Sequence, residues 1–141
     1  MKIRHTIYNQ ILYFCPNVPP EVGGIIGASN DVIDAVFFDS GLYQDRMAIY
    51  TPNVNRINKV IAQWKKDDIR FLGLFHSHPE RQEALSLSDI EYIRSIMFSV
   101  PERVKELYFP IIIPNSHIIS YKAINQNHNI LIVSDTIDLV P

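Results

Sequence analysis

The sequence predicts a single α/β domain of the α+β type, in which a mixed β-sheet is flanked by helices. The chain has 141 residues, of which 47% are hydrophobic, and this suffices for one domain with a substantial core. Apolar runs of strand length are interrupted by segments in which apolar residues recur at helical spacing. No linker, repeat or low-complexity tract divides the sequence. These observations predict one layered domain that spans residues 1–141.

The first part of the chain predicts a helix, a buried strand and a pair of strands. Apolar residues near the N-terminus recur at helical spacing, although tyrosine and isoleucine there leave a strand start possible. A Ser-Gly turn signal separates the two members of the strand pair. The expected ranges are 5–13 for the helix, 22–28 for the buried strand, and 32–38 and 46–50 for the pair.

The second part of the chain predicts two amphipathic helices and four strands. Asn53 is a favourable N-cap for a helix whose apolar residues fall on one face. A second helix is expected to begin near Ser86 and to end before Pro101, because proline disfavours a helical residue before it. The expected strands are 69–75, 108–113, 117–124 and 130–137.

Charge and N-terminal composition exclude several classes of function. The formal net charge is −2, so no bulk basic field indicates nucleic acid or an anionic membrane as a partner. No apolar run approaches the length of a membrane span, and the N-terminal segment lacks a signal-peptide cleavage site. Cys15 is the only cysteine, so no internal disulfide indicates an oxidising compartment, and a buried apolar role is expected for it. We therefore expect a cytoplasmic protein.

Two histidines at the end of a predicted strand are the strongest sign of chemistry. His76 and His78 are separated by one residue, so their side chains lie on the same face of a strand. Pro79 ends that strand, and Asp89 opens the next helix, where its carboxylate could return to the two imidazoles. Two histidines and one carboxylate leave the fourth position of a tetrahedral zinc ion open, which is typical of hydrolytic sites.

A simpler interpretation of the helix start needs no metal. Ser86 or Ser88 would serve as the N-cap, and Asp89 would supply the acidic residue of the first turn. Capping accounts for the serine and the aspartate as well as metal binding does. It does not account for the two histidines at the end of a buried strand.

A second metal motif also fits part of the spacing. His76 and His78 with Glu83 downstream match the first half of a cupin site, but a cupin jelly roll needs glycine-rich turns between many strands. The last glycine of this chain is Gly73, so the cupin hypothesis fails. No partner at ligand spacing is found for the three remaining histidines, His5, His117 and His128.

The complete motif resembles the signature of a known protease family. The His-Ser-His-Pro sequence at 76–79, six residues, Ser86, two residues and Asp89 match the JAB1/MPN metalloproteases, also called JAMM proteases. That family adds an upstream glutamate before an apolar strand that contains glycine, and Glu21 occupies the expected place. One departure is Ala28, where the family usually has a second glycine. The resemblance is to a compact, prokaryotic-type member with the JAB1/MPN fold, which is similar to the cytidine deaminase architecture.

The resemblance implies a role for each residue of the motif. His76, His78 and Asp89 would bind one Zn²⁺ per chain, and the metal would activate a water molecule. Glu21 would act as the general base through hydrogen bonds to that water. Ser86 would donate a hydrogen bond to the developing oxyanion.

The resemblance also implies a class of substrate, and alternatives stay open. The family hydrolyses isopeptide or peptide bonds after the C-terminal tail of ubiquitin-like proteins, and its compact members process ubiquitin-like or sulfur-carrier proteins. One alternative is a metallopeptidase or amidase that acts on small peptides with the same site. The other is a catalytically silent MPN scaffold that only binds protein partners. The sequence leaves open the oligomeric state and the identity of the tail.

Overall fold

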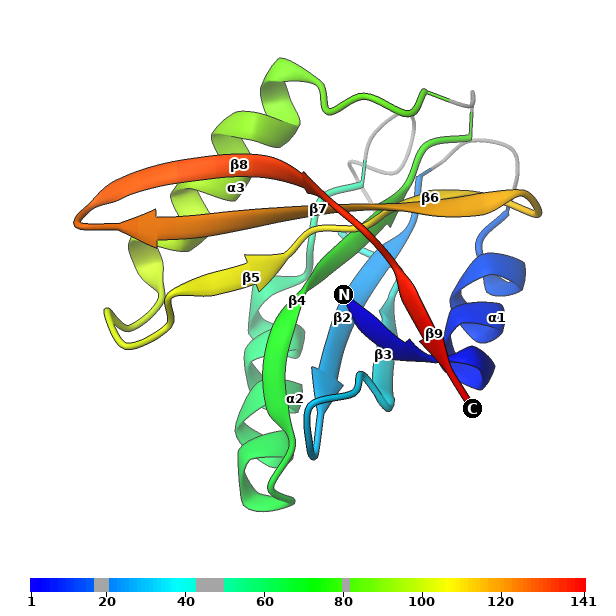
Figure 1. The fold of residues 1–141 in the computed structure, drawn as a ribbon, viewed down its shortest axis with the longest axis horizontal. Helices are drawn as coiled ribbons and strands as arrows, with labels where there is room; N and C mark the ends of the chain where they lie inside the picture. Colours follow the sequence, from blue (N-terminus) through cyan, green and yellow to red (C-terminus); the bar gives the residue numbers. More distant parts are fainter. Residues whose placement is uncertain (17–20, 43–49, 80–81) are drawn as a thin grey trace.

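A computed structural model describes residues 1–16, 21–42, 50–79 and 82–141 of the chain (Figure 1). Within these ranges the chain forms three helices, α1 (His5–Phe14), α2 (Val54–Lys66) and α3 (Leu87–Ser99). The described strands are β1 (Lys2–Arg4), β2 (Gly23–Ala28), β3 (Ala35–Asp39), β4 (Arg70–Ser77), β5 (Glu106–Tyr108), β6 (Ile111–Ile113), β7 (His117–Gln126), β8 (Asn129–Asp135) and β9 (Asp138–Val140).

Strand β4 lies inside a mixed seven-stranded sheet. The strand order is β3-β2-β4-β5-β7-β6, β8 pairs with β7, and β6 also pairs with β4. Strand β2 is antiparallel to both β3 and β4, whereas β4 is parallel to β5 and β6. Strands β1 and β9 form a separate parallel pair, which brings the two ends of the chain side by side (Figure 1). Because β4 has neighbours on both sides, its C-terminal end is held firmly where the histidines begin.

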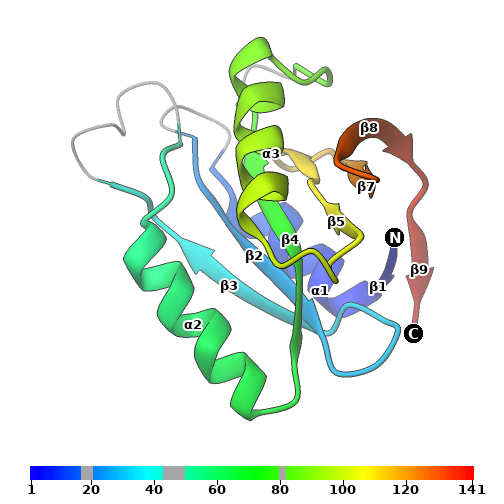
Figure 2. The same cartoon turned by 90° about the vertical axis from the view of Figure 1, so that its left-hand side faces the viewer.

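Helix α1 covers one face of the sheet, and α2 and α3 cover the other (Figure 2). Neighbouring strand residues alternate between the two faces: Ile26 and Phe75 pack in the α1 layer, whereas Ile25 and Leu74 pack in the layer of α2 and α3. The helix residues buried against the second face are Ile57, Trp64, Ile93 and Met97. The predicted mixed sheet flanked by helices is therefore confirmed.

A close approach of two backbones fixes β4 beside β5. Gly73 has a φ of +157°, and a Cβ atom there would lie 1.9 Å from the carbonyl oxygen of Tyr108. Only glycine fits this contact without movement of the backbone. Gly73 pairs with Tyr108 in the parallel register, so the contact lies in the strand that leads to His76.

Most of the predicted elements are confirmed within one to three residues. The helix expected over 5–13 is α1, the strand expected over 22–28 is β2, and the strand expected over 32–38 is shorter and begins at Ala35. The strand expected to begin at Ile69 and to end at Pro79 is β4, Arg70–Ser77. Residues 46–49 of the expected partner strand lie outside the described residues.

Two predictions at the C-terminal side need correction. The strand expected over 108–113 is two strands, because Pro110 lies between them and has no N–H for a ladder hydrogen bond. The strand expected over 130–137 ends at Asp135, because the chain turns away from β7 to pair with β1, which the sequence did not predict. Range 117–124 is confirmed as part of β7.

Two further expectations concern burial and membranes. Cys15 is 2% exposed, and burial raises the pKa of its thiol to about 12, so the expected buried role is confirmed. Among the described residues, no helix combines the length and the apolar character needed to cross a membrane.

Candidate metal centre

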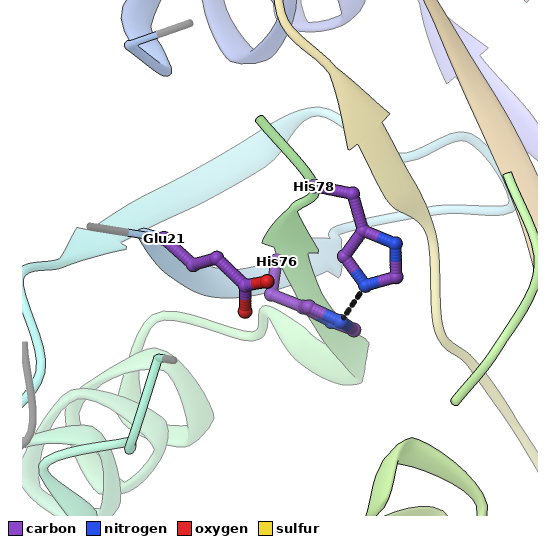
Figure 3. A group of neighbouring side chains, drawn as sticks. All are labelled: Glu21, His76 and His78. Atoms are coloured by element: carbon purple, nitrogen blue, oxygen red, sulfur yellow. Dashed lines mark hydrogen bonds between the residues drawn. The ribbon is translucent and has the colours of Figure 1, made fainter. Parts of the chain in front are cut away.

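The end of β4 brings the two predicted histidine ligands together. The Nε2 atoms of His76 and His78 lie 2.8 Å apart, and Figure 3 shows the two rings converging at this point. Backbone hydrogen bonds hold the segment, since the N–H of His78 donates to the carbonyl of Ile112 at 2.9 Å. The two side chains converge as expected, although β4 ends at Ser77 and His78 is the residue that follows it.

Asp89 reaches both imidazoles from the start of α3. Its Oδ1 atom lies 3.1 Å from Nε2 of His76, and its Oδ2 atom lies 3.4 Å from Nε2 of His78. Burial alone would raise the pKa of Asp89, but hydrogen bonds from the two imidazoles outweigh burial and hold that pKa well below its usual range. The carboxylate is therefore ionised, which is the form that binds a cation.

The same carboxylate also caps α3. The hydroxyl oxygen of Ser86 accepts a hydrogen bond from the backbone N–H of Asp89 at 3.1 Å. In return, Oδ2 of Asp89 accepts from the backbone N–H of Ser86 at 2.9 Å. This is a capping box, so the capping interpretation is confirmed. It is compatible with the ligand interpretation, because the Asp89 carboxylate contacts the Ser86 N–H and both imidazoles at the same time.

A backbone carbonyl fixes the orientation of the second histidine. Nδ1 of His78 lies 2.7 Å from the carbonyl oxygen of Gln82, which can only accept a hydrogen bond. Nδ1 therefore carries a proton, and in the neutral ring Nε2 keeps its lone pair for a metal. In the protonated ring both nitrogens donate, Nδ1 to Gln82 and Nε2 to Asp89; burial lowers the pKa of His78, but these hydrogen bonds outweigh it, and the net shift is upward. A bound metal would take the place of the Nε2 proton.

The distances among the three side chains are comparable with the ligand spacing of a tetrahedral zinc site. Ligands at the usual zinc distances lie about 3.3 Å from one another in a tetrahedron. The distances here are 2.8 Å between the two Nε2 atoms and 3.1 and 3.4 Å from these atoms to the carboxylate oxygens. Both nitrogen and carboxylate oxygen are ligands that zinc accepts. His76 and His78 can therefore share a cation with Asp89, which approaches them through its two different oxygens, or with Glu21, which also lies within ligand reach of both.

Glu21 faces these ligands from the residue before Val22 and β2. A carboxylate oxygen of Glu21 and one ring nitrogen each of His76 and His78 lie within 4.8 Å of one another. Figure 3 shows the three side chains together. The neighbouring Val22 is held twice by Ser77, whose Oγ accepts from the N–H of Val22 at 3.0 Å and whose N–H donates to its carbonyl at 2.8 Å. Glu21 is therefore positioned by β4, the strand that also supplies the histidines.

All five predicted site residues line one open cleft. The cleft has a volume of about 480 Å³, within the usual range for small ligand sites. The predicted residues in its wall are Glu21, His76, His78, Ser86 and Asp89. These residues come from the segment before β2, the end of β4 and the start of α3, and the cleft is open to solvent.

Three residues that support the cleft were not assigned a role from the sequence. Ser77 holds Val22, as described above. Asp39 is 2% exposed and accepts a hydrogen bond from the hydroxyl of Tyr50 at 2.6 Å. The backbone N–H of Tyr50 donates to Oε2 of Glu21 at 3.4 Å. The position of Asp39 directly after an apolar run could have identified it as a residue of the site. Nothing in the local sequence identifies Tyr50.

The histidines that were left out of the site lie elsewhere. His117 pairs with Glu83 at 2.7 Å, and the hydroxyl of Tyr121 donates to the Glu83 carbonyl at 2.8 Å. These contacts hold Glu83 against β7. The neighbouring Gln82 carbonyl accepts the hydrogen bond from His78. His5 and His128 do not line the cleft.

Comparison with known proteins identifies similar folds only. No protein-family model matches the chain, and no curated protein matches it. The solution structure of a protein from Desulfitobacterium hafniense, a structural-genomics target, superposes with a TM-score of 0.70 at 17% identity, over 99% of this chain and 92% of that one. A Salinibacter ruber target gives a TM-score of 0.56 at 16% identity, over 97% of this chain and 90% of that one. The shared property is the fold.

Proposed function

We propose that this protein is a zinc-dependent isopeptidase or peptidase of the JAMM type, with the JAB1/MPN fold. It would hydrolyse the amide bond after the C-terminal tail of a ubiquitin-like or sulfur-carrier protein. The observation that supports this most strongly is the approach of Asp89 to both imidazoles, at 3.1 and 3.4 Å, in a cleft that Glu21 also lines. A closed structural zinc site would need a fourth protein ligand in place of an open position.

The proposed chemistry divides between the metal and the side chains. A bound zinc ion would lower the pKa of its water toward neutrality and polarise the scissile carbonyl. Glu21 would take the proton of the attacking water and return it to the leaving amine. The Oγ of Ser86 already accepts a hydrogen bond from the N–H of Asp89, so its own O–H remains to donate to the developing oxyanion.

A cleavage assay tests this function directly. The zinc-loaded protein is incubated with ubiquitin-like and sulfur-carrier proteins that carry a C-terminal extension, and the products are identified by mass spectrometry. The proposal predicts a product that ends at the tail, and loss of this product with Glu21→Gln. The matched control is Glu91→Gln, which removes a carboxylate from an exposed position of α3 outside the cleft.

Other outcomes of the assay would favour the alternatives. Cleavage of short peptides without cleavage of any tail would indicate a small-peptide metallopeptidase or amidase with the same ligands. No cleavage of either class by the zinc-loaded protein would leave the MPN scaffold as the better account.

A further inference from the structure

A buried carboxylate lies behind one wall of the cleft. Asp39 is the last residue of β3 and is 2% exposed. Its Oδ2 atom accepts two hydrogen bonds, from the hydroxyl of Tyr50 at 2.6 Å and from the backbone N–H of Asn53 at 2.9 Å. Its Oδ1 atom is buried and has no hydrogen-bond partner among the residues that the structure describes. Burial of a charged group is unfavourable, so a carboxylate here indicates a specific use.

Both hydrogen bonds hold the same short segment of chain. Tyr50 and Asn53 enclose residues 51–52, and residues 50–52 line the cleft. The carbonyl of Thr51 also accepts from the N–H of Leu42 at 2.9 Å. This part of the cleft wall, residues 50–52, is therefore held by the Asp39 carboxylate through Tyr50 on one side and Asn53 on the other.

Tyr50 links this wall to Glu21. Its backbone N–H donates to Oε2 of Glu21 at 3.4 Å. Its ring lies against the backbone of Gly23, where a Cβ atom would be 2.5 Å from a ring carbon. Burial, and next the hydrogen bond to Asp39, raise the pKa of the Tyr50 hydroxyl above its usual value, so this hydroxyl remains a donor to the carboxylate. Tyr50 is thus fixed at its hydroxyl, its ring and its N–H.

We propose that Asp39 and Tyr50 are positioning residues, which hold the carboxylate of Glu21 toward the metal ligands. The inference rests on the proposed role of Glu21 as the general base. Neither residue needs to touch the substrate's reacting atoms. Their loss would change the orientation of Glu21 while His76, His78 and Asp89 stay in place. Turnover would therefore fall, with zinc content unchanged and KM changed little.

The test compares Tyr50→Phe with Tyr108→Phe. The first variant removes the hydroxyl that meets Asp39 and keeps the ring and the N–H. The second removes a tyrosine hydroxyl outside the cleft. Hydrogen exchange of the residue 50 amide is followed by NMR in the zinc-loaded proteins, together with zinc content, kcat and KM on a cleavable tail substrate.

The expected result for Tyr50→Phe is specific. Exchange of the residue 50 amide becomes roughly tenfold faster, because release of Tyr50 weakens one hydrogen bond. The kcat falls by about 10- to 100-fold, since a small displacement of a reacting group has an effect of this size. Tyr108→Phe matches the wild type in both measurements.

A third variant keeps the inference testable without turnover. Glu21→Ala removes the acceptor, so exchange of the Tyr50 amide accelerates while that of the Asn53 amide, which donates to Asp39, does not. Unchanged exchange at residue 50 in both Glu21→Ala and Tyr50→Phe overturns the positioning role, whatever the activity. If the amide responds as expected but the wild type cleaves no substrate, the structural link stands and the proposed function fails. Unchanged kcat in Tyr50→Phe of an active enzyme also overturns the positioning role.

Discussion

The Oδ1 atom of Asp89 lies 3.1 Å from Nε2 of His76, although the two residues are on different elements, α3 and β4. The other oxygen of the same carboxylate caps the helix through the N–H of Ser86. The first turn of α3 is thereby fixed against the end of β4. Capping and metal binding depend on one side chain, and variants can separate the two.

Replacement of Asp89 should distinguish its two roles. Asp89→Asn keeps an amide oxygen that can accept from the N–H of Ser86, but it removes the charge that binds zinc. We expect both Asp89→Asn and Asp89→Ala to lose zinc, and the alanine variant to be less stable than the asparagine variant by about 1 kcal/mol, the usual value of a cap. Urea unfolding of the zinc-free proteins and zinc titration measure these effects. Ser86→Ala, which weakens the cap but removes no zinc ligand, should retain zinc; full zinc occupancy in Asp89→Ala would reduce Asp89 to a capping residue.

Glu21→Gln should separate zinc binding from turnover. The amide has nearly the same shape as the carboxylate but cannot accept the proton, so kcat should fall by about 10²- to 10⁴-fold. Zinc content should remain that of the wild type, since His76, His78 and Asp89 are intact. Stopped assays with metal analysis of the same sample measure both. Substantial activity in a zinc-loaded Glu21→Gln protein would exclude Glu21 as the base.

Gly73→Ala should destabilise the sheet at its centre. The added Cβ atom would lie 1.9 Å from the Tyr108 carbonyl oxygen, so β4 and β5 would have to separate. We expect the free energy of unfolding to fall by about 3 kcal/mol or more. Urea denaturation measures this, with Ser95→Ala at an exposed position of α3 as the control. A change below about 1 kcal/mol would mean that β4 and β5 leave room for a Cβ atom at this point.

Asp135 should make stability depend on acidic pH. Its carboxylate accepts hydrogen bonds from the Met1 amine at 2.8 Å and from the Ser120 hydroxyl at 3.1 Å. Burial would raise its pKa, but these bonds outweigh burial and lower the pKa below the usual 3.8. The stabilisation is therefore complete above the unfolded pKa and is lost as pH falls through the lower, folded pKa.

The matched variant for this effect is Asp135→Asn. Below about pH 4 the free energy of unfolding of the wild type should fall more steeply than that of the variant. Urea unfolding of zinc-free protein at a series of pH values measures the difference. Parallel pH curves for the two proteins would remove Asp135 from the account of acid stability.

The sequence predicts the parts of the site that depend on local spacing. The His-x-His pattern places two side chains on one strand face, and the Ser-x-x-Asp pattern begins a helix, so both were recognisable without the fold. Asp39 and Tyr50 were not recognised, because no local pattern specifies that the Tyr50 hydroxyl reaches the Asp39 carboxylate. Both residues adjoin the strand pair expected over 32–38 and 46–50, but the contact itself depends on side-chain packing.

The same distinction explains the corrections to the fold. Strand β1 has only three residues, and its pairing with β9 joins opposite ends of the chain, so local propensity does not indicate it. The break at Pro110 had a local signal, but the apolar residues on both sides suggested one continuous strand. Helix α2 was predicted well because its cap at Asn53 and its apolar face are both local features.

The most direct measurement of the central claim is the zinc content of the chain. Elemental analysis is made on protein purified without added metal or a metal-binding tag, followed by titration of the metal-free protein with zinc. The account predicts about one zinc ion per chain, as expected for a single three-ligand site. It also predicts that His76→Ala and His78→Ala lose this zinc, while His117→Ala keeps it. A wild-type chain that contains no zinc, and takes up none on titration, would contradict the account.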